Sequence, residues 1–188
     1  FLLRKARVAS SEPQYRSAQR LVNHLRCCYT RTILGQATAP VGTPDSRATV
    51  KIITSHERTD MDAFASLYAA SLLYPDYEPV LPSKLNRNVR DLAALFKDEL
   101  PMLTRRKLTH RRITHMLLVD TQGIAPLRGV DETTLVHIID HHPLEHELPS
   151  TATYEGGAVG ATTTLLTERI REQGLPLSRV GASLMLMG

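Results

Sequence analysis

Three segments of the chain are apolar and rich in β-branched residues along their whole length, and they constrain the fold most strongly. They lie at residues 50–54, 114–119 and 134–139. A strand that alternates polar and apolar residues buries one face, whereas a strand that is apolar throughout is buried on both faces. Segments with helical spacing begin near Ala63, Asn88 and Gly160 and separate the strands. This alternation predicts an α/β fold with a mostly parallel sheet and helices on both faces.

The positive charge lies in the first quarter of the chain. Residues 1–49 contain eight Lys or Arg and two Asp or Glu, a net charge of +6, whereas residues 50–188 contain fifteen and seventeen, a net charge of −2. Both cysteines, Cys27 and Cys28, also lie before residue 49, and a cluster rich in Pro and Gly occupies residues 40–46. This change in composition predicts a domain boundary near residue 49.

Residues 1–49 allow two interpretations. A basic arm could bind nucleic acid. We favour a disordered or non-native leader, because the chain begins with Phe1 and contains no Met before Met61. A valine codon can start translation in bacteria, so the natural protein is expected to begin at Val50, directly before the first strand.

Composition restricts the class of protein. With 42% hydrophobic and 22% charged residues, the chain can build a packed core. It contains no run of 18 apolar residues, so the sequence predicts no membrane-spanning helix and no membrane partner. The start lacks the features of a signal peptide, and the two adjacent cysteines cannot stabilise a small secreted fold. We therefore expect a cytoplasmic protein.

Acidic residues and histidines stand directly after the three apolar strands. The first strand is followed by His56, Asp60 and Asp62, the second by Asp120, and the third by Asp140, His141 and His142. Because ligands bind beyond the carboxyl ends of parallel strands, we expect these side chains to meet at one edge of the sheet. Taken singly, each of these residues has a simpler explanation than metal binding. Asp60, for example, could be no more than a helix cap. We expect the other histidines to lie in loops, strands or on the surface: His110, His115, His137 and His146.

Converging carboxylates repel one another and resist desolvation, so such a cluster needs positive charge. Bound divalent cations supply it. Carboxylate and imidazole ligands without thiolate suit manganese, magnesium or iron and allow zinc. Six of these residues are candidate ligands: His56, Asp60, Asp62, Asp120, His141 and His142. Six ligands are too many for one ion with open positions, and they fit two ions that share a bridging carboxylate. Two such ions can activate a water molecule and hold a phosphoryl group during displacement.

The motifs His56-x-x-x-Asp60-x-Asp62-Ala63, Val119-Asp120-Thr121 and Asp140-His141-His142-Pro143 resemble those of the DHH phosphoesterase superfamily, over about residues 50–188. That superfamily includes single-strand exonucleases, oligoribonucleases and manganese pyrophosphatases. The resemblance implies two manganese ions, with magnesium as an alternative: His56 and Asp60 would hold the first ion, Asp62 and His141 the second, and Asp120 would bridge them. It also implies that His142 faces the substrate phosphate and that Asp140 orients the histidines.

A second resemblance is narrower. The segment Leu85-Asn86-Arg87-Asn88-Val89-Arg90 and residues 157–166 resemble a bacterial group in which a DHH domain precedes paired CBS modules and a poly(A) polymerase/tRNA nucleotidyltransferase-type domain. The family's fourth motif, an aspartate that completes the second metal site, and its substrate-binding lobe do not occur in these residues. We therefore expect residues 50–188 to form a truncated N-terminal DHH lobe with an incomplete metal site, whose partners include missing C-terminal domains of the same polypeptide.

Three functions are compatible with these observations. The leading hypothesis is a two-metal enzyme that hydrolyses phosphodiester or phosphoanhydride bonds in nucleotides or at the ends of single-stranded nucleic acid, including RNA. The second is an RNA-handling or regulatory module of a multidomain tRNA nucleotidyltransferase or poly(A) polymerase. The third, a degenerate binding domain, is disfavoured because ligands are intact at five positions. The sequence does not separate a nuclease from a pyrophosphatase, and it leaves open whether the chain forms a homo-oligomer.

Overall fold

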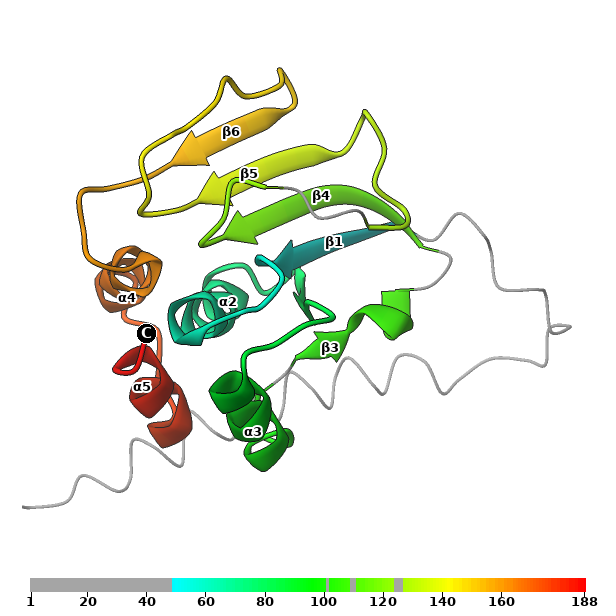
Figure 1. Ribbon diagram of the computed structural model, residues 1–188. Coiled ribbons are helices and arrows are strands. Elements are labelled where there is room, and N and C mark those ends of the chain that lie inside the picture. The colour runs from blue at the N-terminus through cyan, green and yellow to red at the C-terminus, as the bar shows by residue number, and fades with distance from the viewer. Residues whose placement is uncertain (1–48, 101, 109–110, 124–126) are drawn as a thin grey trace, which may run out of the picture. The chain divides into compact units, whose positions relative to one another are not determined.

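The computed structural model describes residues 49–100, 102–108, 111–123 and 127–188 (Figure 1). The predictions for residues 1–48, including the basic leader with Cys27 and Cys28, lie outside the described residues. The elements follow one another in this order: β1 (Thr49–Thr54), α2 (Met61–Leu73), β2 (Glu78–Leu81), α3 (Arg87–Leu95), β3 (Leu103–Thr104), the 3₁₀ helix η1 (Arg105–Leu108), β4 (Arg112–Val119), β5 (Leu135–Ile139), β6 (Ala152–Glu155), α4 (Thr162–Glu172) and α5 (Arg179–Met185).

The strands in the described residues form a six-stranded sheet in the order β3-β2-β1-β4-β5-β6, and every neighbouring pair is parallel. The α/β class and the parallel sheet predicted from the sequence are therefore confirmed. The chain leaves β1 toward β2 on one side and returns to β4 on the other, so the strand order reverses between β1 and β4. In open α/β sheets, ligands bind at this reversal, outside the carboxyl ends of the strands.

Apolar side chains cover both faces of the sheet. On one face, Ile53, Leu117 and Ile139 pack against residues of all four α-helices, as Figure 1 shows by the helices gathered below the sheet. On the other face, Ile52 and Met116 pack with residues of η1 and of the loops around it. Among the described residues, the α-helices thus lie on one face, whereas the sequence pattern predicts helices on both.

Helix α2 lies between the sheet and the pair α4 and α5. Its small residues allow this close packing, and eight consecutive positions from Ala63 to Ala70 are buried. Asp60 caps the helix, because its carboxylate accepts a hydrogen bond from the backbone N–H of Ala63 at 3.1 Å. Burial of the helix on all sides fixes its first turn, which carries Asp62, at the end of β1.

Two local predictions are corrected. The spacing of Val89, Leu92, Leu95 and Phe96 predicts a helix over about residues 88–100 with these side chains on one face. In the structure, α3 ends at Leu95, whose side chain is 73% exposed. The basic residues between Lys107 and Arg112 predict a solvated connector. In the structure, Lys107 and Leu108 belong to η1, and Arg112 begins β4. In the described part of the chain, no helix combines the length and the apolar character that crossing a membrane requires.

Candidate metal centre

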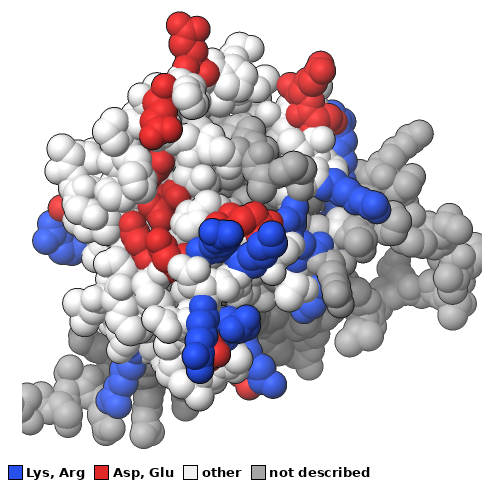
Figure 2. All heavy atoms as spheres, viewed as in Figure 1, with Lys and Arg blue, Asp and Glu red and all other residues white. Residues whose placement is uncertain are grey.

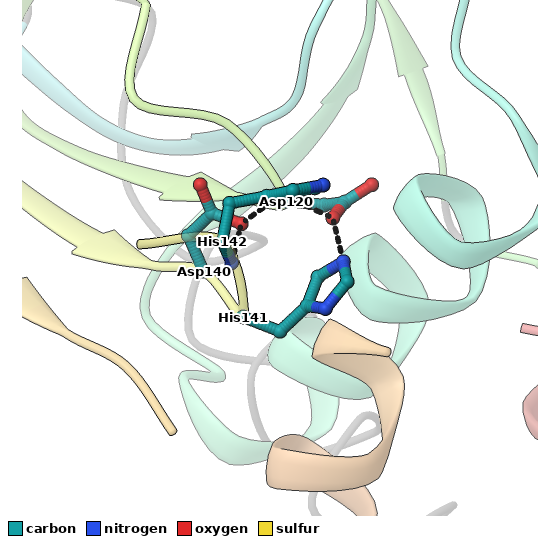
Figure 3. Close-up of side chains that lie close together, drawn as sticks. All are labelled: Asp120, Asp140, His141 and His142. Atoms are coloured by element: carbon teal, nitrogen blue, oxygen red, sulfur yellow. Dashed lines mark hydrogen bonds and ion pairs between the residues drawn. The ribbon is translucent and has the colours of Figure 1, made fainter. Parts of the chain in front are cut away.

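The residues that follow β4 and β5 meet at the carboxyl edge of the sheet (Figure 3), and His56, which follows β1, lies beside them. Asp120 lies at the centre of this site. Its Oδ2 atom is 3.6 Å from His56 Nε2, and its Oδ1 atom is 3.8 Å from His141 Nε2 and 3.9 Å from His142 Nδ1. The convergence arises because β4 pairs with both β1 and β5, so that three distant parts of the sequence end side by side.

Within the described residues, two groups of side chains have the spacing of metal ligands, and both contain Asp120. The first is His56, Asp60 and Asp120; the second is Asp120, Asp140, His141 and His142, with ligand atoms within 4.8 Å of one another in each group. Each carboxylate oxygen of Asp120 faces one group. Asp120 adopts φ +56°, a left-handed conformation that is uncommon outside glycine and that aspartate tolerates better than most residues.

His56 and His141 present the same ring nitrogen to Asp120. His141 Nδ1 donates to the Val159 carbonyl at 3.2 Å, and His56 Nδ1 donates to the Glu57 carbonyl at 2.8 Å. A carbonyl only accepts, so Nδ1 carries a proton in both rings, and Nε2 is the nitrogen that faces the carboxylates. Metal-binding histidines are oriented in this way by a hydrogen bond from their other nitrogen. The residues present therefore fit divalent cations held by carboxylate oxygens and imidazole Nε2 atoms.

Asp140 is 1% exposed and binds the loop after β5. Its Oδ1 atom accepts hydrogen bonds from His142 Nδ1 at 2.8 Å and from the His142 backbone N–H at 3.2 Å, and its Oδ2 atom accepts from Gln122 Nε2 at 3.2 Å. Both oxygens of Asp140 are thus engaged, Oδ1 with His142 and Oδ2 with Gln122. This geometry agrees with an orienting residue better than with a direct metal ligand, although the roles of Asp140 and His142 stay predictions.

Asp62 lies beside the second group but outside it. Its Oδ2 atom is 3.9 Å from His141 Nε2 and accepts the backbone N–H of Thr162 at 2.8 Å. Its Oδ1 atom accepts the backbone N–H of Thr163 at 2.8 Å and the Thr163 hydroxyl at 2.6 Å. Asp62 therefore caps the start of α4, where the N-cap residue, Ala161, has no side chain that could do so. Its role as a ligand stays a prediction.

The electrostatics show an excess of negative charge. The carboxylate of Asp120, which lies 3.6 Å from Nε2 of His56, is the largest cause that raises the pKa of His56 to about 9. The hydrogen bond to Asp140 raises the pKa of His142, and burial raises the pKa of the Asp120 carboxyl. The ion pairs of Asp60, Asp62 and Asp120 are made with histidines. The site thus favours positive charge on its imidazoles, as expected of carboxylates that need cations.

A cavity of about 490 Å³ opens onto these side chains. Its walls include residues at the starts of three helices and two residues after α5: Asp60 to Asp62 at α2, Asn86, Asn88 and Val89 at α3, Gly160 and Ala161 at α4, and Met187 with Gly188. Exposed Lys84, Arg87 and Arg90 lie on or beside the first turn of α3. Figure 2 shows Lys and Arg side chains gathered above α3 on this face, next to Asp and Glu side chains. A cationic surface therefore borders an acidic cavity.

The loop between His56 and Asp60 is fixed to the segment before α3. Arg58 N–H donates to the Lys84 carbonyl at 2.9 Å, and Asn86 N–H donates to the Thr59 carbonyl at 3.0 Å. The carboxylate of Glu57 accepts the Lys84 N–H at 2.9 Å and a guanidinium N–H of Arg105 at 2.7 Å. These contacts hold the loop in the conformation that brings His56 to Asp120.

The structure also identifies residues that the sequence did not single out for a role in the site. Thr162 is fully buried and contacts three of the predicted ligands, and Gln122 holds the loop of Asp140 and His142. In the sequence, nothing but their proximity to a motif indicates that Thr162 and Gln122 belong to the site. His115 and His137 lie in β4 and β5 and belong to neither group, His146 is exposed, and His110 lies outside the described residues.

Comparisons with known proteins agree with the motifs. Residues 51–188 match the family described as "DHH family, N-terminal domain". The A-adding tRNA nucleotidyltransferase of Geobacter sulfurreducens is 33% identical over 143 residues, which cover 73% of this chain and 16% of that protein. The manganese-dependent inorganic pyrophosphatase of Bacillus subtilis is 26% identical over 141 residues, which cover 72% of this chain and 45% of that protein.

The fold has a counterpart among solved structures. A Methanococcus jannaschii protein assigned as a family II inorganic pyrophosphatase superposes with a TM-score of 0.55 at 22% identity, over 73% of this chain and 46% of that one. The chain spans less than half of the pyrophosphatases and about one-sixth of the nucleotidyltransferases that it matches. The profile match over residues 51–188, the parallel sheet and the three motifs at its carboxyl edge together show that the chain belongs to the DHH family, through its N-terminal phosphoesterase domain.

Proposed function

We propose that this chain is the metal-holding lobe of a two-metal phosphoesterase that hydrolyses phosphodiester or phosphoanhydride bonds in nucleotides or at the ends of single-stranded nucleic acid. The observation that carries the proposal is the position of Asp120, whose two oxygens face two separate ligand groups. A carboxylate shared in this way is the geometry that two neighbouring cations require.

The cations that fit these donors are Mn²⁺ or Mg²⁺, and when bound they polarise phosphoryl oxygens and lower the pKa of water. His56, Asp60 and Asp120 would hold one ion, and Asp120 with His141 and Asp62 the other. His142 has a different task. Asp140 fixes its Nδ1–H, which leaves Nε2 for a substrate oxygen, and the raised pKa favours its protonated form. His142 can therefore donate a proton to a phosphate or leaving-group oxygen.

The surroundings of the cavity support an anionic substrate larger than inorganic phosphate. The cavity of about 490 Å³ has room for a nucleotide unit. Exposed Arg87 and Arg90 on the first turn of α3 add positive charge at its border. These features favour a nucleotide or nucleic acid end, and they support the proposal that RNA or a nucleotide is the partner of this site.

A second candidate rests on a different observation. The relative that is 33% identical is by name an A-adding tRNA nucleotidyltransferase, and the chain corresponds to only 16% of its length. In a protein of that kind, this domain would handle or proofread RNA while another domain transfers the nucleotide. The two candidates differ in whether the domain itself breaks phosphoester bonds.

The test uses the complete polypeptide that carries this chain, with Asp120→Asn as the comparison. Pyrophosphate, a mononucleotide and a 5′-labelled short oligoribonucleotide are offered with Mn²⁺, with Mg²⁺ and with EDTA. We expect metal-dependent release of phosphate or mononucleotide, abolished by Asp120→Asn, and about two Mn²⁺ bound by calorimetry. Asp120→Asn that kept both hydrolysis and stoichiometry would refute the two-metal assignment. Nucleotide addition to tRNA without hydrolysis would select the second candidate.

A further inference from the structure

Thr162 is the first residue of α4 and is fully buried beneath the candidate metal centre. Its backbone N–H donates to Asp62 Oδ2 at 2.8 Å. Its hydroxyl donates to Asp120 Oδ1 at 3.0 Å and accepts the backbone N–H of His141 at 3.1 Å. One threonine therefore contacts predicted ligands from all three motifs, which come from the ends of β1, β4 and β5.

The direction of these hydrogen bonds is determined by chemistry. The His141 N–H can only donate, so the Thr162 oxygen accepts there, and its single proton is left for Asp120. A carboxylate oxygen only accepts when ionised, which agrees with this direction. The Thr162 hydroxyl thus binds Oδ1 of Asp120 and leaves Oδ2 to face His56.

Rotation of the Asp120 carboxylate decides whether its two oxygens can serve two groups. Asp120 is only 5% exposed, so little solvent competes with Thr162 for its carboxylate. Thr162 is β-branched and lies on a helix, where its χ1 angle is restricted. The buried Thr162 hydroxyl therefore holds the plane of the Asp120 carboxylate. The same hydroxyl accepts the backbone N–H of His141 and so fixes the position of this adjacent ligand.

We propose that Thr162 is a positioning residue, which sets the rotation of the Asp120 carboxylate and the place of His141 so that both ligand groups can bind a divalent ion. This inference rests on the proposed function for the presence of metal. The inference goes beyond the proposed function, because it assigns the alignment of the two ligand groups to a hydroxyl that does not itself bind an ion.

The experiment compares Thr162→Val, which keeps the branched shape and loses the hydroxyl, with Thr162→Ser, which keeps the hydroxyl. Thr164→Val is the matched control, because Thr164 lies two residues further along α4 and is exposed. Mn²⁺ affinity is measured by calorimetry after treatment with EDTA. We expect Thr162→Val to weaken Mn²⁺ binding about 10–100-fold, as loss of a residue that orients a ligand does. Thr162→Ser should retain most of the affinity, and Thr164→Val all of it.

A second readout needs no metal. Amide hydrogen exchange at His141 should accelerate in Thr162→Val, because the acceptor of its N–H is gone, and stay slow in Thr162→Ser. If Thr162→Val does not fold, Thr162→Ala and Thr162→Ser form the test pair, since they differ by one oxygen atom. Wild-type Mn²⁺ affinity in the variant without the hydroxyl, or an equal loss in Thr164→Val, would overturn the proposal. If the complete wild-type polypeptide that carries this chain binds no Mn²⁺, the proposed function fails, and exchange at His141 still decides the role of Thr162.

Discussion

Asp62 and Thr162 are separated by 100 positions in the chain, yet the carboxylate of Asp62 accepts the backbone N–H of Thr162 at 2.8 Å. The same carboxylate accepts the N–H of Thr163, so both amides at the start of α4 are satisfied by a side chain of α2. A negative charge at a helix N-terminus is favourable, because it faces the positive end of the helix dipole. Helix α4 is therefore capped by a tertiary contact, which joins the first motif to the segment after β6.

This contact predicts a loss of stability in Asp62→Ala. The metal-free variant should unfold more easily by about 1–2 kcal/mol, the usual cost of losing an N-cap. Urea unfolding followed by circular dichroism measures the difference. Asp91→Ala, an exposed acid on α3, is the control and should change the free energy of unfolding by less than about 0.5 kcal/mol. Equal stability of the Asp62→Ala variant and the wild type would show that the contact contributes little.

The buried packing of α2 predicts a larger effect for Phe64→Ala. Phe64 is fully buried between the sheet and the neighbouring helices, so its removal should lower the free energy of unfolding by about 3–5 kcal/mol. Leu95→Ala is a matched control, because Leu95 is a large apolar residue that is 73% exposed. It should change stability by less than about 0.5 kcal/mol. Comparable losses in both variants would contradict the described core.

His137 predicts a pH dependence that is separate from the metal centre. Burial lowers its pKa from the ordinary value of 6.5 despite Glu155, whose carboxylate lies 3.5 Å from Nε2; Arg169 of α4, paired with Glu155, also lowers it. Because the folded state binds this proton less tightly than the unfolded state, His137 lowers stability as the pH falls below about 6.5.

The measurement is the difference in unfolding free energy between the wild type and His137→Gln, from pH 5 to 8. The difference should become more favourable to the variant as the pH falls, and it should be constant above pH 7. A difference that does not change with pH, or one that changes in the opposite direction, would contradict the lowered pKa.

Metal binding predicts stabilisation by mass action. Mn²⁺ at one hundred times its dissociation constant should stabilise the folded chain by about 2.7 kcal/mol for each site. His56→Ala removes a ligand of the first group and should weaken Mn²⁺ binding at least about tenfold. His115→Ala is the control, because His115 lies in β4 outside both groups. Thermal unfolding with Mn²⁺ and with EDTA reports both effects, and equal shifts in the two variants would argue against the assigned ligands.

The site could be predicted because its residues follow strands that are recognisable in the sequence. Asp120 and Asp140 come directly after apolar runs, and parallel pairing of β4 with β1 and β5 brings those ends together. Thr162 could not be predicted in the same way. Its contacts depend on how α4 docks beside α2, and no spacing within the sequence records that a hydroxyl there will face Asp120.

Local patterns also failed where tertiary structure decides. Leu95 has helical spacing from Leu92, but α3 ends at this residue and leaves its side chain in solvent. The two-residue strand β3 carries no pattern that could be recognised, and only its pairing with β2 defines it. Short elements of this kind are determined by their neighbours rather than by their own residues.

The connection between the His56–Asp60 loop and the segment before α3 has a mechanical consequence. Hydrogen bonds of Arg58, Thr59 and Glu57 with Lys84 and Asn86 join that loop to the start of α3. The loop that carries His56 and Asp60 is therefore fixed to the cavity wall formed by α3, whereas Asp120, His141 and His142 follow the neighbouring strands β4 and β5. A displacement of α3 would move His56 and Asp60 relative to Asp120 and His141, so the distance between two bound ions would report strain on that helix.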